Sequence, residues 1–578
     1  MANYSEHERA LAAHIEMVPG INRLRELLDV DASPETSAAI LDAAARFAER
    51  VLDPVNKTGD RNGSKLVNGR VQAADGYVEA QEAFLAEGWP TLDALEKWGG
   101  QGLPLVFHSA AQEMFDRGCV AFGMLLAPQR AGAKLLDAHA EDALKAEWLP
   151  KLATGEWSTT ICISEPDAGS DVGRLRTFGT KNADGSWAIT GEKCWISFGD
   201  HNLNKRIAHC LIARTEVGSK GTHGLSLFLV PDRFFENDGT TTRNSIFVRR
   251  LEEKLGLHGS PTCALGFEGA RGFLIGKEGK GLQALFTMIS TMRLSVAVQG
   301  VGIASAAVAT AFSYAEERRQ GGPANAPPVT IRNHADIQRM LMRMAARVEM
   351  LRGLVMTLAV NVELSEIETD ATARDNNGAL ATMLLPIAKT LAAEAAFDCS
   401  SDAIQILGGA GYTQEWGVEQ NLRDARIFAI YEGTSGIQAL DILHRRLWRD
   451  KARGFDLFIA QARADVATSA HKTEGQTLAQ VLDILESTMA KLNAWATSPF
   501  EAEAGANAFL QLAGVAATSW IALRLVNSTH ESAAAPRLAA LGRFALSDAV
   551  LRAQALAGEI ALGAKRLKDF DAVAASFQ

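Results

Sequence analysis

The stretch "STTICISEPDAGSDVG" (Ser158–Gly173) marks the point where the sequence changes from helical to β-type patterning. It starts with β-branched and small apolar residues and then breaks into a Pro/Gly turn. Runs of this kind continue to about residue 270, and "NADGSW" (Asn182–Trp187) among them has the composition of a tight hairpin turn. Short runs separated by such turns indicate an antiparallel β-barrel or sandwich domain, which we place at residues 159–276.

Helical patterning precedes this block. In "PETSAAILDAAARFAERVLDPV" (Pro34–Val55), apolar residues stand three and four positions apart, and Pro54 closes the run. Thr36 or Ser37 is the expected helix cap. A second helical pattern covers Ser109–His139, where glycines allow close packing of helices. We therefore expect an N-terminal helical domain over residues 1–158.

Helical patterning returns after the β block and continues to the end of the chain. We expect a four-helix-bundle-like domain at residues 277–448, interrupted by the solvent loop "QGGPANAPPV" (Gln320–Val329). A further helical extension is expected at residues 449–578. Its clearest helix is "TLAQVLDILESTMAKLNAWA", with a possible capping box from Thr477 to Gln480. That helix carries one apolar stripe, made of Leu478, Leu482, Leu485, Met489 and Leu492. The fold class is α+β and multidomain.

The composition excludes several classes of protein. The 578 residues carry a formal net charge of −10 and no Lys/Arg-rich block, which argues against a nucleic-acid-binding protein. The six cysteines are scattered and form no CxxC pair, so we expect buried, reduced thiols, no metal site and a cytoplasmic location. The most apolar long stretch, Ala379–Phe397, is interrupted by Pro386, Lys389 and Glu394, so we expect a buried helix and no membrane span. The N-terminus lacks the pattern of a secretory signal.

Two segments of the β block could line a ligand site. The turn in Ile163–Gly173 offers serines and backbone N–H groups that can hold a phosphate or the edge of a planar ring, although it also suits an ordinary Asx turn. Trp195, with Ser197 near it, could form the wall of an aromatic cofactor site, although a single Trp more often belongs to a core.

Two segments of the later helices raise the same question. Arg318 and Arg319 stand at a helix end, where they could pair with phosphate or simply be solvated. The glycines after Gln405, at positions 408, 409 and 411, allow close approach of another group or a tight turn between helices.

A single carboxylate, Glu432, stands in "IYEGTSGIQ" (Ile430–Gln438) between a bulky Tyr431 and a Gly-Thr-Ser-Gly turn. Taken alone it suits an acidic residue near a helix start, where it would favour the helix dipole. Nicotinamide-Rossmann, P-loop, serine-hydrolase and zincin signatures are not found in the sequence.

Together, these segments resemble the acyl-CoA dehydrogenase family in identity, order and spacing, over about residues 40–445. The extension beyond residue 450 resembles the longer bacterial branch, which includes 3-methylmercaptopropionyl-CoA dehydrogenases. The motifs that carry the resemblance are "SEPDAGSD", "GEKCWIS", an "ER" pair at Glu317–Arg318, "QILGGAGY", "LRDAR" and "YEGTSGIQ".

The resemblance implies FAD-dependent α,β-dehydrogenation of an acyl-CoA thioester to a trans-2-enoyl-CoA. Glu432 corresponds to the base that removes the α-proton while hydride passes from the β-carbon to flavin N5. The implied FAD contacts on the β block and the base segment are Ile163, Ser164, Ser170, Trp195, Ser197 and Thr434. The implied contacts to the FAD of a neighbouring subunit are Arg318, Gln320, Gln405, Gly408 and Gly409. The implied substrate contacts are Ser170, Arg293, Tyr431 and Gly433, with Arg293 as a buried arginine near the base.

The sequence departs from the family pattern at Gly321, where an aromatic residue is usual, and at Gly436, where a larger polar residue is frequent. In a minority of relatives the base stands one residue before the buried arginine. Here that residue is Met292, which cannot act as a base, so Glu432 is favoured.

The implied substrate is 3-methylmercaptopropionyl-CoA or a short or medium fatty acyl-CoA. The implied partners are an electron-transfer flavoprotein and a second copy of the chain in a homodimer. Two alternatives stay open at this point, namely an oxidase that uses O2 and a non-catalytic scaffold of the same fold.

Overall fold

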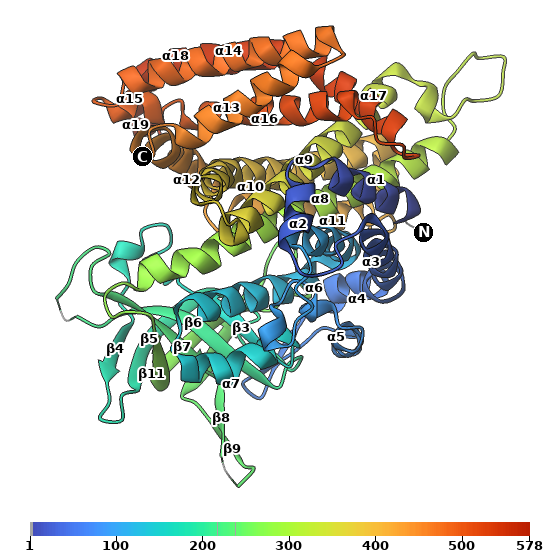
Figure 1. Cartoon of the computed structure of the whole chain (residues 1–578). Coiled ribbons are helices and arrows are strands. Elements are labelled where there is room, and N and C mark those ends of the chain that lie inside the picture. Colours follow the sequence, from blue (N-terminus) through green and yellow to red (C-terminus); the bar gives the residue numbers. More distant parts are fainter. Residues whose placement is uncertain (1–3, 217, 237, 578) are drawn as a thin grey trace. The chain divides into compact units, whose positions relative to one another are not determined.

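The computed structural model describes residues 4–216, 218–236 and 238–577, which fold into two compact units (Figure 1). The first unit comprises Met1–Ala45, Pro104–Glu113 and Val296–Gln578. The second unit comprises Arg46–Leu103 and Met114–Ser295. Each unit is described by itself.

A seven-stranded sheet dominates the second unit. Its strands are β3 (Trp157–Cys162), β4 (Phe178–Lys181), β5 (Trp187–Ser197), β6 (Arg206–Arg214), β7 (Leu225–Pro231), β10 (Ile246–Leu251) and β11 (Thr262–Ile275). The pairings β11–β7, β7–β6, β6–β4, β4–β5 and β5–β11 form a closed ring. The predicted β-barrel is therefore confirmed. Each strand of the ring is paired on both sides, whereas β10 and β3 lie outside it and pair with β11 and β6 respectively.

The pairing within this sheet is mainly antiparallel, but β6 runs parallel to β3 and to β4. This differs from the purely antiparallel domain that we expected. β3 and β4 run in the same direction, β5 runs opposite to both, and β6 turns back to the direction of β3 and β4. The predicted hairpin turn is confirmed, because the N–H of Asn182 donates to the carbonyl of Ser186 at 2.8 Å and Gly185 has a φ of 86°.

Helices and two small hairpins complete the second unit. The hairpins are β1 (Lys65–Val67) with β2 (Arg70–Gln72) and β8 (Arg233–Phe235) with β9 (Thr241–Arg243), and the sequence did not predict them. The helices that lie wholly in this unit are the π-helix η1 (Ala48–Leu52), α4 (Asp53–Asn62), α5 (Tyr77–Ala86), η2 (Trp89–Thr91), η3 (Glu96–Trp98), α7 (Asp142–Ala153) and η4 (Val172–Arg174).

Three helices have residues in both units, namely α3 (Pro34–Phe47), α6 (Leu105–His139) and α8 (Gly281–Glu317). The predicted caps of α3, Thr36 and Ser37, are wrong. The helix begins at Pro34, and the hydroxyl of Ser33 accepts the N–H of Thr36 at 3.2 Å. A cap must precede the first turn, whose N–H groups lack partners within the helix.

Long helices build the first unit. Its elements up to residue 449 are α1 (Tyr4–Met17), α2 (Ile21–Leu27), η5 (Ile331–Asn333), α9 (Ala335–Ile367), α10 (Ala371–Leu407), η6 (Gly408–Tyr412), α11 (Val418–Ala425), η7 (Arg426–Ala429), α12 (Ser435–Leu440) and the π-helix η8 (Asp441–Arg449). The connection between α9 and α10 is short, and Asp370 caps α10 by accepting the N–H of Ala373 at 2.7 Å.

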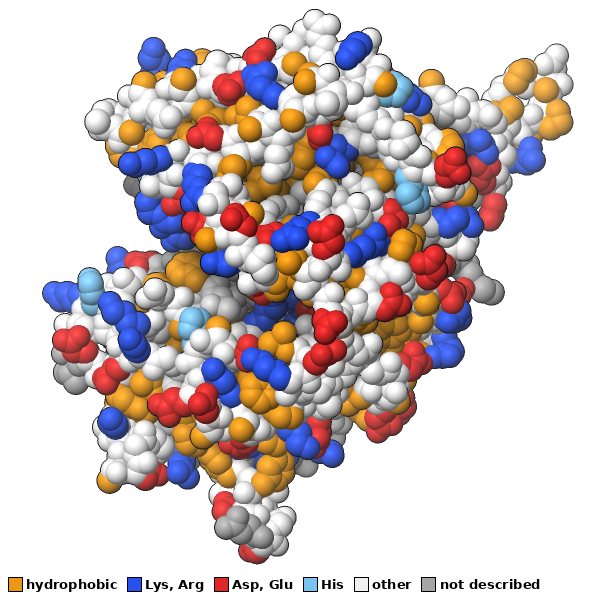
Figure 2. Space-filling model, in the orientation of Figure 1, with side chains coloured by type: hydrophobic (Ala, Val, Ile, Leu, Met, Phe, Trp, Pro, Cys, Tyr) orange, Lys and Arg blue, Asp and Glu red, His pale blue; other side chains and the backbone are white. Residues whose placement is uncertain are grey.

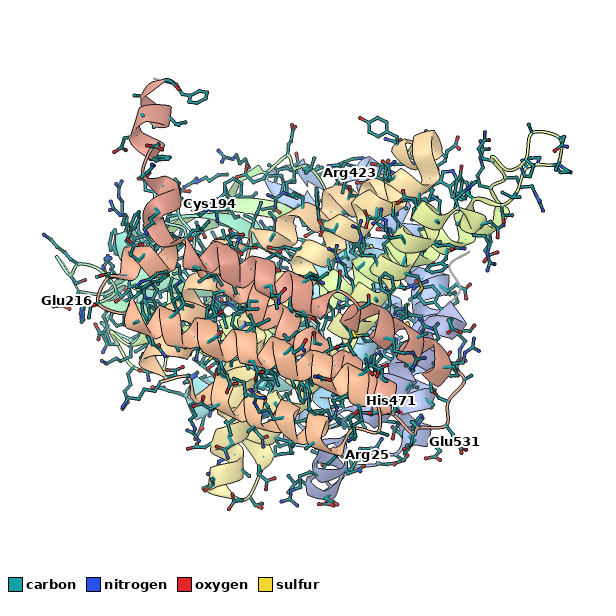
Figure 3. The ribbon with its side chains drawn as sticks, turned by 90° about the horizontal axis from the view of Figure 1, so that it is seen from above. Arg25, Cys194, Glu216, Arg423, His471 and Glu531 are labelled. Atoms are coloured by element: carbon teal, nitrogen blue, oxygen red, sulfur yellow. The ribbon has the colours of Figure 1, made fainter. Side chains whose placement is uncertain are left out.

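The helical extension is confirmed. It consists of α13 (Arg453–Thr468), α14 (Lys472–Ala494), α15 (Pro499–Glu503), α16 (Ala506–Asn527), α17 (Ala535–Leu546), α18 (Ala549–Ala561), η9 (Gly563–Leu567) and α19 (Phe570–Ala575). Figure 3 places His471, at the start of α14, and Glu531, after α16, at the same end of the extension. A bond of 2.9 Å from the Ser469 hydroxyl to Asn527 joins these two connections.

The apolar stripe predicted on α14 is buried along its whole length, as expected for a helix that packs on its neighbours. The predicted capping box is wrong, because α14 begins at Lys472 and Thr477 lies inside it, donating to the carbonyl of Thr473 at 3.1 Å. All six cysteines lie among the described residues, are buried and form no disulfide, as predicted.

Three helices are long and apolar enough to cross a membrane by length and composition: α8, Ala371–Tyr412 and α16. In the fold, 78–83% of their most apolar windows is buried, so these apolar side chains serve packing within the protein. Residues 320–328 of the loop Gln320–Val329 are exposed, as predicted, and Val329 is half-buried; Figure 2 shows the loop projecting from the surface.

Candidate active site

The predicted site residues fall in both units. In the second unit, the loop after β3 lies beside β5. The N–H of Cys194 donates to the carbonyl of Ser164 at 3.0 Å, and the ammonium of Lys193 donates to the carbonyl of Ile163 at 2.9 Å. Two of the predicted cofactor residues are thus joined through their backbones to the strand that carries Trp195. Ser170, further along the loop, is exposed.

A buried ion pair fixes this loop. The ammonium of Lys193 lies 2.8 Å from the Glu165 carboxylate, which also accepts the N–H groups of Arg176 and Thr177 at 2.6 and 3.1 Å. Burial opposes ionisation of Glu165, but Lys193 and these hydrogen bonds hold the pKa of the carboxyl below its ordinary value. The sequence did not predict this pair, although both partners stand in motifs, Glu165 in "SEPD" and Lys193 in "GEKCW".

Trp195 stands out from the end of β5. The register of β5 against β11 shifts between Lys193 and Ile196, and Trp195 adopts a left-handed φ of 63° at this bulge. Its side chain is 61% exposed, whereas the next residue, Ile196, is buried. Half-buried Ser197 pairs with Thr262 of β11. A bulge next to a ligand site typically re-aims a side chain, and here it presents an indole ring to solvent.

In the first unit, the segment between η7 and α12 carries Glu432. Its φ is 54°, and the φ of Gly433 is 93°, so two consecutive residues are left-handed. Thr434 is the N-cap of α12 and accepts the N–H of Ile437 at 3.2 Å. Glu432 therefore precedes the cap and lies outside the helix, in a conformation that non-glycine residues adopt at a cost. It is half-buried.

Two buried side chains hold the backbone around Glu432. The ammonium of Lys389, on α10, donates to the carbonyls of Phe428 and Gly433, each at 2.8 Å. The amide of Gln438, on α12, donates to the carbonyls of Glu432 and Gly433, each at 3.2 Å. Sequence reasoning treated Lys389 only as an interruption of an apolar run and did not assign it to the site.

Tyr431 is also held in place. Its ring stacks on Phe428 with centroids 5.9 Å apart, and its hydroxyl donates to Gln299 of α8 at 2.5 Å. Beside this segment lies an open cavity of about 510 Å³, whose lining includes Arg426, Ile430 and Thr434. The segment that carries Glu432 thus borders a space large enough for part of a cofactor.

The predicted residues of the "ER" and "QILGGAGY" motifs lie on the surface of the chain. Arg318, Gln320 and Gln405 are exposed. A Cβ added to Gly408 or Gly409 would meet no atom within 4 Å, so these glycines present bare backbone to open space. Such exposure is expected of residues that contact a ligand bound to another chain.

Arg293, in the second unit on α8, is half-buried rather than buried as expected, while its neighbour Met292 is 6% exposed. Both lie inside a long helix, where each side chain is positioned by packing rather than by a turn.

Models of the acyl-CoA dehydrogenase family match three consecutive parts of the chain. The N-terminal domain matches residues 34–156, the middle domain residues 160–270 and the C-terminal domain residues 279–447.

Two curated relatives are similar over most of their length. A 3-methylmercaptopropionyl-CoA dehydrogenase from Ruegeria pomeroyi is 37% identical, over 88% of this chain and 87% of the relative. A broad-specificity linear acyl-CoA dehydrogenase from Mycobacterium tuberculosis is 31% identical, over 91% and 90%. Among solved structures, an acyl-CoA dehydrogenase from Bacillus anthracis complexed with FAD shares the fold with a TM-score of 0.76, 20% identity and coverage of 94% of this chain and 90% of that one.

Proposed function

The chain belongs to the acyl-CoA dehydrogenase family, and on that premise we propose that it uses FAD to convert an acyl-CoA into a trans-2-enoyl-CoA, with Glu432 as the base. The observation that carries the assignment of the base is the left-handed pair Glu432–Gly433, held by Lys389 and Gln438. Strained backbone that the surroundings enforce is concentrated at functional sites.

Removal of the α-proton requires a base such as a carboxylate. The carbonyl of a thioester acidifies its α-hydrogens, and a carboxylate that substrate and cofactor shield from water becomes a stronger base. The N–H of Glu432 is proposed as one donor to the carbonyl oxygen, where negative charge develops as the proton leaves. Tyr431, fixed by stacking and by Gln299, covers one side of this segment.

The residues present suit FAD. We propose that Trp195 and Ser197, with Ile163 and Ser164 of the neighbouring loop, contact the isoalloxazine ring, and that Ser170 of the same loop lies where the cofactor meets the substrate. Thr434 is assigned to the phosphate or adenosine part, since it borders the cavity of the first unit. When bound, FAD accepts the hydride that leaves the β-carbon.

A second copy of the chain is part of this proposal. Surface-exposed Arg318, Gln320, Gln405, Gly408 and Gly409 are assigned to the FAD of the partner subunit in a homodimer. The reoxidising partner is proposed to be an electron-transfer flavoprotein, and the compartment the cytoplasm.

For the substrate we propose 3-methylmercaptopropionyl-CoA or a short to medium linear acyl-CoA. The similarity of 37% over most of both chains to a 3-methylmercaptopropionyl-CoA dehydrogenase supports the first. The similarity of 31% to a broad-specificity linear enzyme supports the second. Arg293, Tyr431 and Gly433, with Ser170, are the proposed substrate contacts.

The test is anaerobic addition of single acyl-CoA esters to purified holoenzyme, with the visible absorbance of the flavin as the readout. We expect rapid bleaching by 3-methylmercaptopropionyl-CoA or butyryl-CoA, and reoxidation by an electron-transfer flavoprotein much faster than by air. Bleaching by no ester of the series would overturn the proposal, and rapid reoxidation by O2 alone would make the enzyme an oxidase.

A further inference from the structure

A lysine with no exposed surface lies next to the proposed base. Lys389 is 0% exposed and stands in the middle of α10, between buried Ala388 and Thr390. Burying an ammonium group costs free energy that an apolar side chain of similar size would not cost. A lysine at this position therefore indicates a role other than packing.

The contacts of this lysine show what it does to the backbone. Its ammonium donates to the carbonyls of Phe428 and Gly433, which stand on either side of Glu432 in the chain. One ammonium therefore joins the end of η7 to the turn before α12. Carbonyl oxygens that both point toward one cation fix the direction of the peptides between them, including those on either side of Glu432.

Gln438 makes the second attachment. It is 0% exposed and donates to the carbonyl of Glu432 itself and to that of Gly433. The carbonyl of Gly433 thus accepts from both side chains, one on α10 and one on α12. The left-handed residues Glu432 and Gly433 are held from two different helices.

We propose that Lys389 is a positioning residue for the dehydrogenation reaction, which fixes the left-handed backbone of Glu432 and so the direction of its carboxylate, with Gln438 as its helper. This inference rests on the proposed role of Glu432. A base that is misplaced by about 1 Å loses roughly 100-fold in rate, so a fixed backbone has a direct catalytic value.

The test compares Lys389→Met with Lys389→Arg, Gln438→Leu and the exposed control Lys472→Met, all as holoenzymes. For Lys389→Met we expect flavin reduction per bound FAD to fall about 100-fold, with the KM for the acyl-CoA changed only a few-fold. Lys389→Arg, which keeps donors and charge, should recover part of that loss. Gln438→Leu should give a smaller loss, and Lys472→Met none.

A second readout separates the base from the redox step. Acetyl-CoA has α-hydrogens but no β-carbon, so its exchange of hydrogen for deuterium in D2O reports proton removal alone. The exchange rate in Lys389→Met should fall by the same factor as flavin reduction. A purely structural lysine would lower the melting temperature and FAD content but leave both rates, per bound FAD, unchanged.

Glu432→Gln serves as the reference that separates two kinds of failure. If it abolishes exchange while Lys389→Met and Gln438→Leu keep wild-type rates, the positioning role is overturned and the base assignment stands. If Glu432→Gln itself keeps wild-type exchange, the base assignment fails. Should Lys389→Met fail to fold, the rates of Lys389→Arg and Gln438→Leu decide, and wild-type rates in both overturn the proposal.

Discussion

Trp195 and Glu432 share an uncommon property, since both are non-glycine residues with a left-handed φ. Such a conformation costs of order 1–3 kcal/mol and persists only where the surroundings enforce it. A bulge enforces it at Trp195, and the bonds from Lys389 and Gln438 enforce it at Glu432. Seven non-glycine residues of the described chain have a left-handed φ, and Trp195 and Glu432 are the two that also stand in the six sequence motifs.

Trp195 allows ring contact and backbone strain to be separated. Trp195→Gly removes the ring and places at this position a residue that adopts a left-handed φ at little cost. The melting temperature of the flavin-stripped protein should therefore stay the same or rise, by up to the equivalent of about 1 kcal/mol. FAD content should nevertheless fall strongly, and Trp195→Phe should retain it. Flavin absorbance per chain is the measurement, and full flavin content in Trp195→Gly would contradict the assigned contact.

The proposed contacts to cofactor and substrate could be predicted from the sequence, because they stand in short motifs. The buried charges that support them could not. Lys193 with Glu165, and Lys389 with its carbonyl acceptors, are each recognisable only when segments far apart in the chain meet. A lone charge in an apolar run is the signal that such a partner exists.

At the scale of elements, the turn between η7 and α12 decides where Glu432 stands. Thr434 ends the turn by capping α12, and Gly433 provides the φ of 93° that the turn requires. Helical and β-type periodicity predicted most long elements correctly, whereas both predicted caps failed. Ser33 caps α3 through its hydroxyl, whereas α14 begins after His471 without a side-chain cap, so polar residues in the sequence did not locate either helix start.

Two glycines, Gly433 in this turn and Gly436 just after it in α12, give a matched pair of substitutions. Gly433→Ala puts a Cβ on a left-handed residue and should lower the free energy of unfolding by about 1 kcal/mol or more. Gly436→Ala lies inside α12 without a positive φ and should preserve or raise stability, by up to about 1 kcal/mol. Thermal unfolding of both variants checks this, and an equal loss in both would contradict the role of the turn.

At the scale of the whole molecule, a buried charge cluster ties distant parts of the first unit together. Arg352 of α9 lies 2.6 Å from both Glu113 of α6 and Glu349 of α9. His7 of α1 reaches Glu113 at 3.0 Å, and Arg537 of the extension reaches Glu349 at 2.8 Å. α1 and the extension are thus joined through one network of ion pairs. No sequence motif predicted this network.

Removing the central cation should be costly. Arg352→Met leaves two buried carboxylates without their main partner and should lower the free energy of unfolding by about 3–5 kcal/mol. Arg339→Met, on the same helix, breaks only the exposed pair with Asp336 and should cost less than about 1 kcal/mol. Urea unfolding of both variants makes the comparison, and similar losses would contradict a central role for Arg352.

The same cluster predicts a dependence of stability on pH. Burial opposes ionisation of Glu113, but Arg352 and His7 bring its pKa down from 4.5 to about 2. Because the folded pKa is depressed, this contribution to stability is complete above pH 4.5 and is lost as the pH falls toward 2. Unfolding titrations across this range should show a smaller slope in Arg352→Met than in wild type, and equal slopes would count against the cluster.

The central claim, that Glu432 removes the α-proton, is tested most directly by the rate of flavin reduction in a single anaerobic turnover of Glu432→Gln. The substitution keeps the size of the side chain and removes its basicity, so FAD should remain bound while the rate falls by orders of magnitude. Glu531→Gln, an exposed residue of the extension, should reduce its flavin at the wild-type rate. A Glu432→Gln enzyme that reduces its flavin as fast as wild type would contradict the claim.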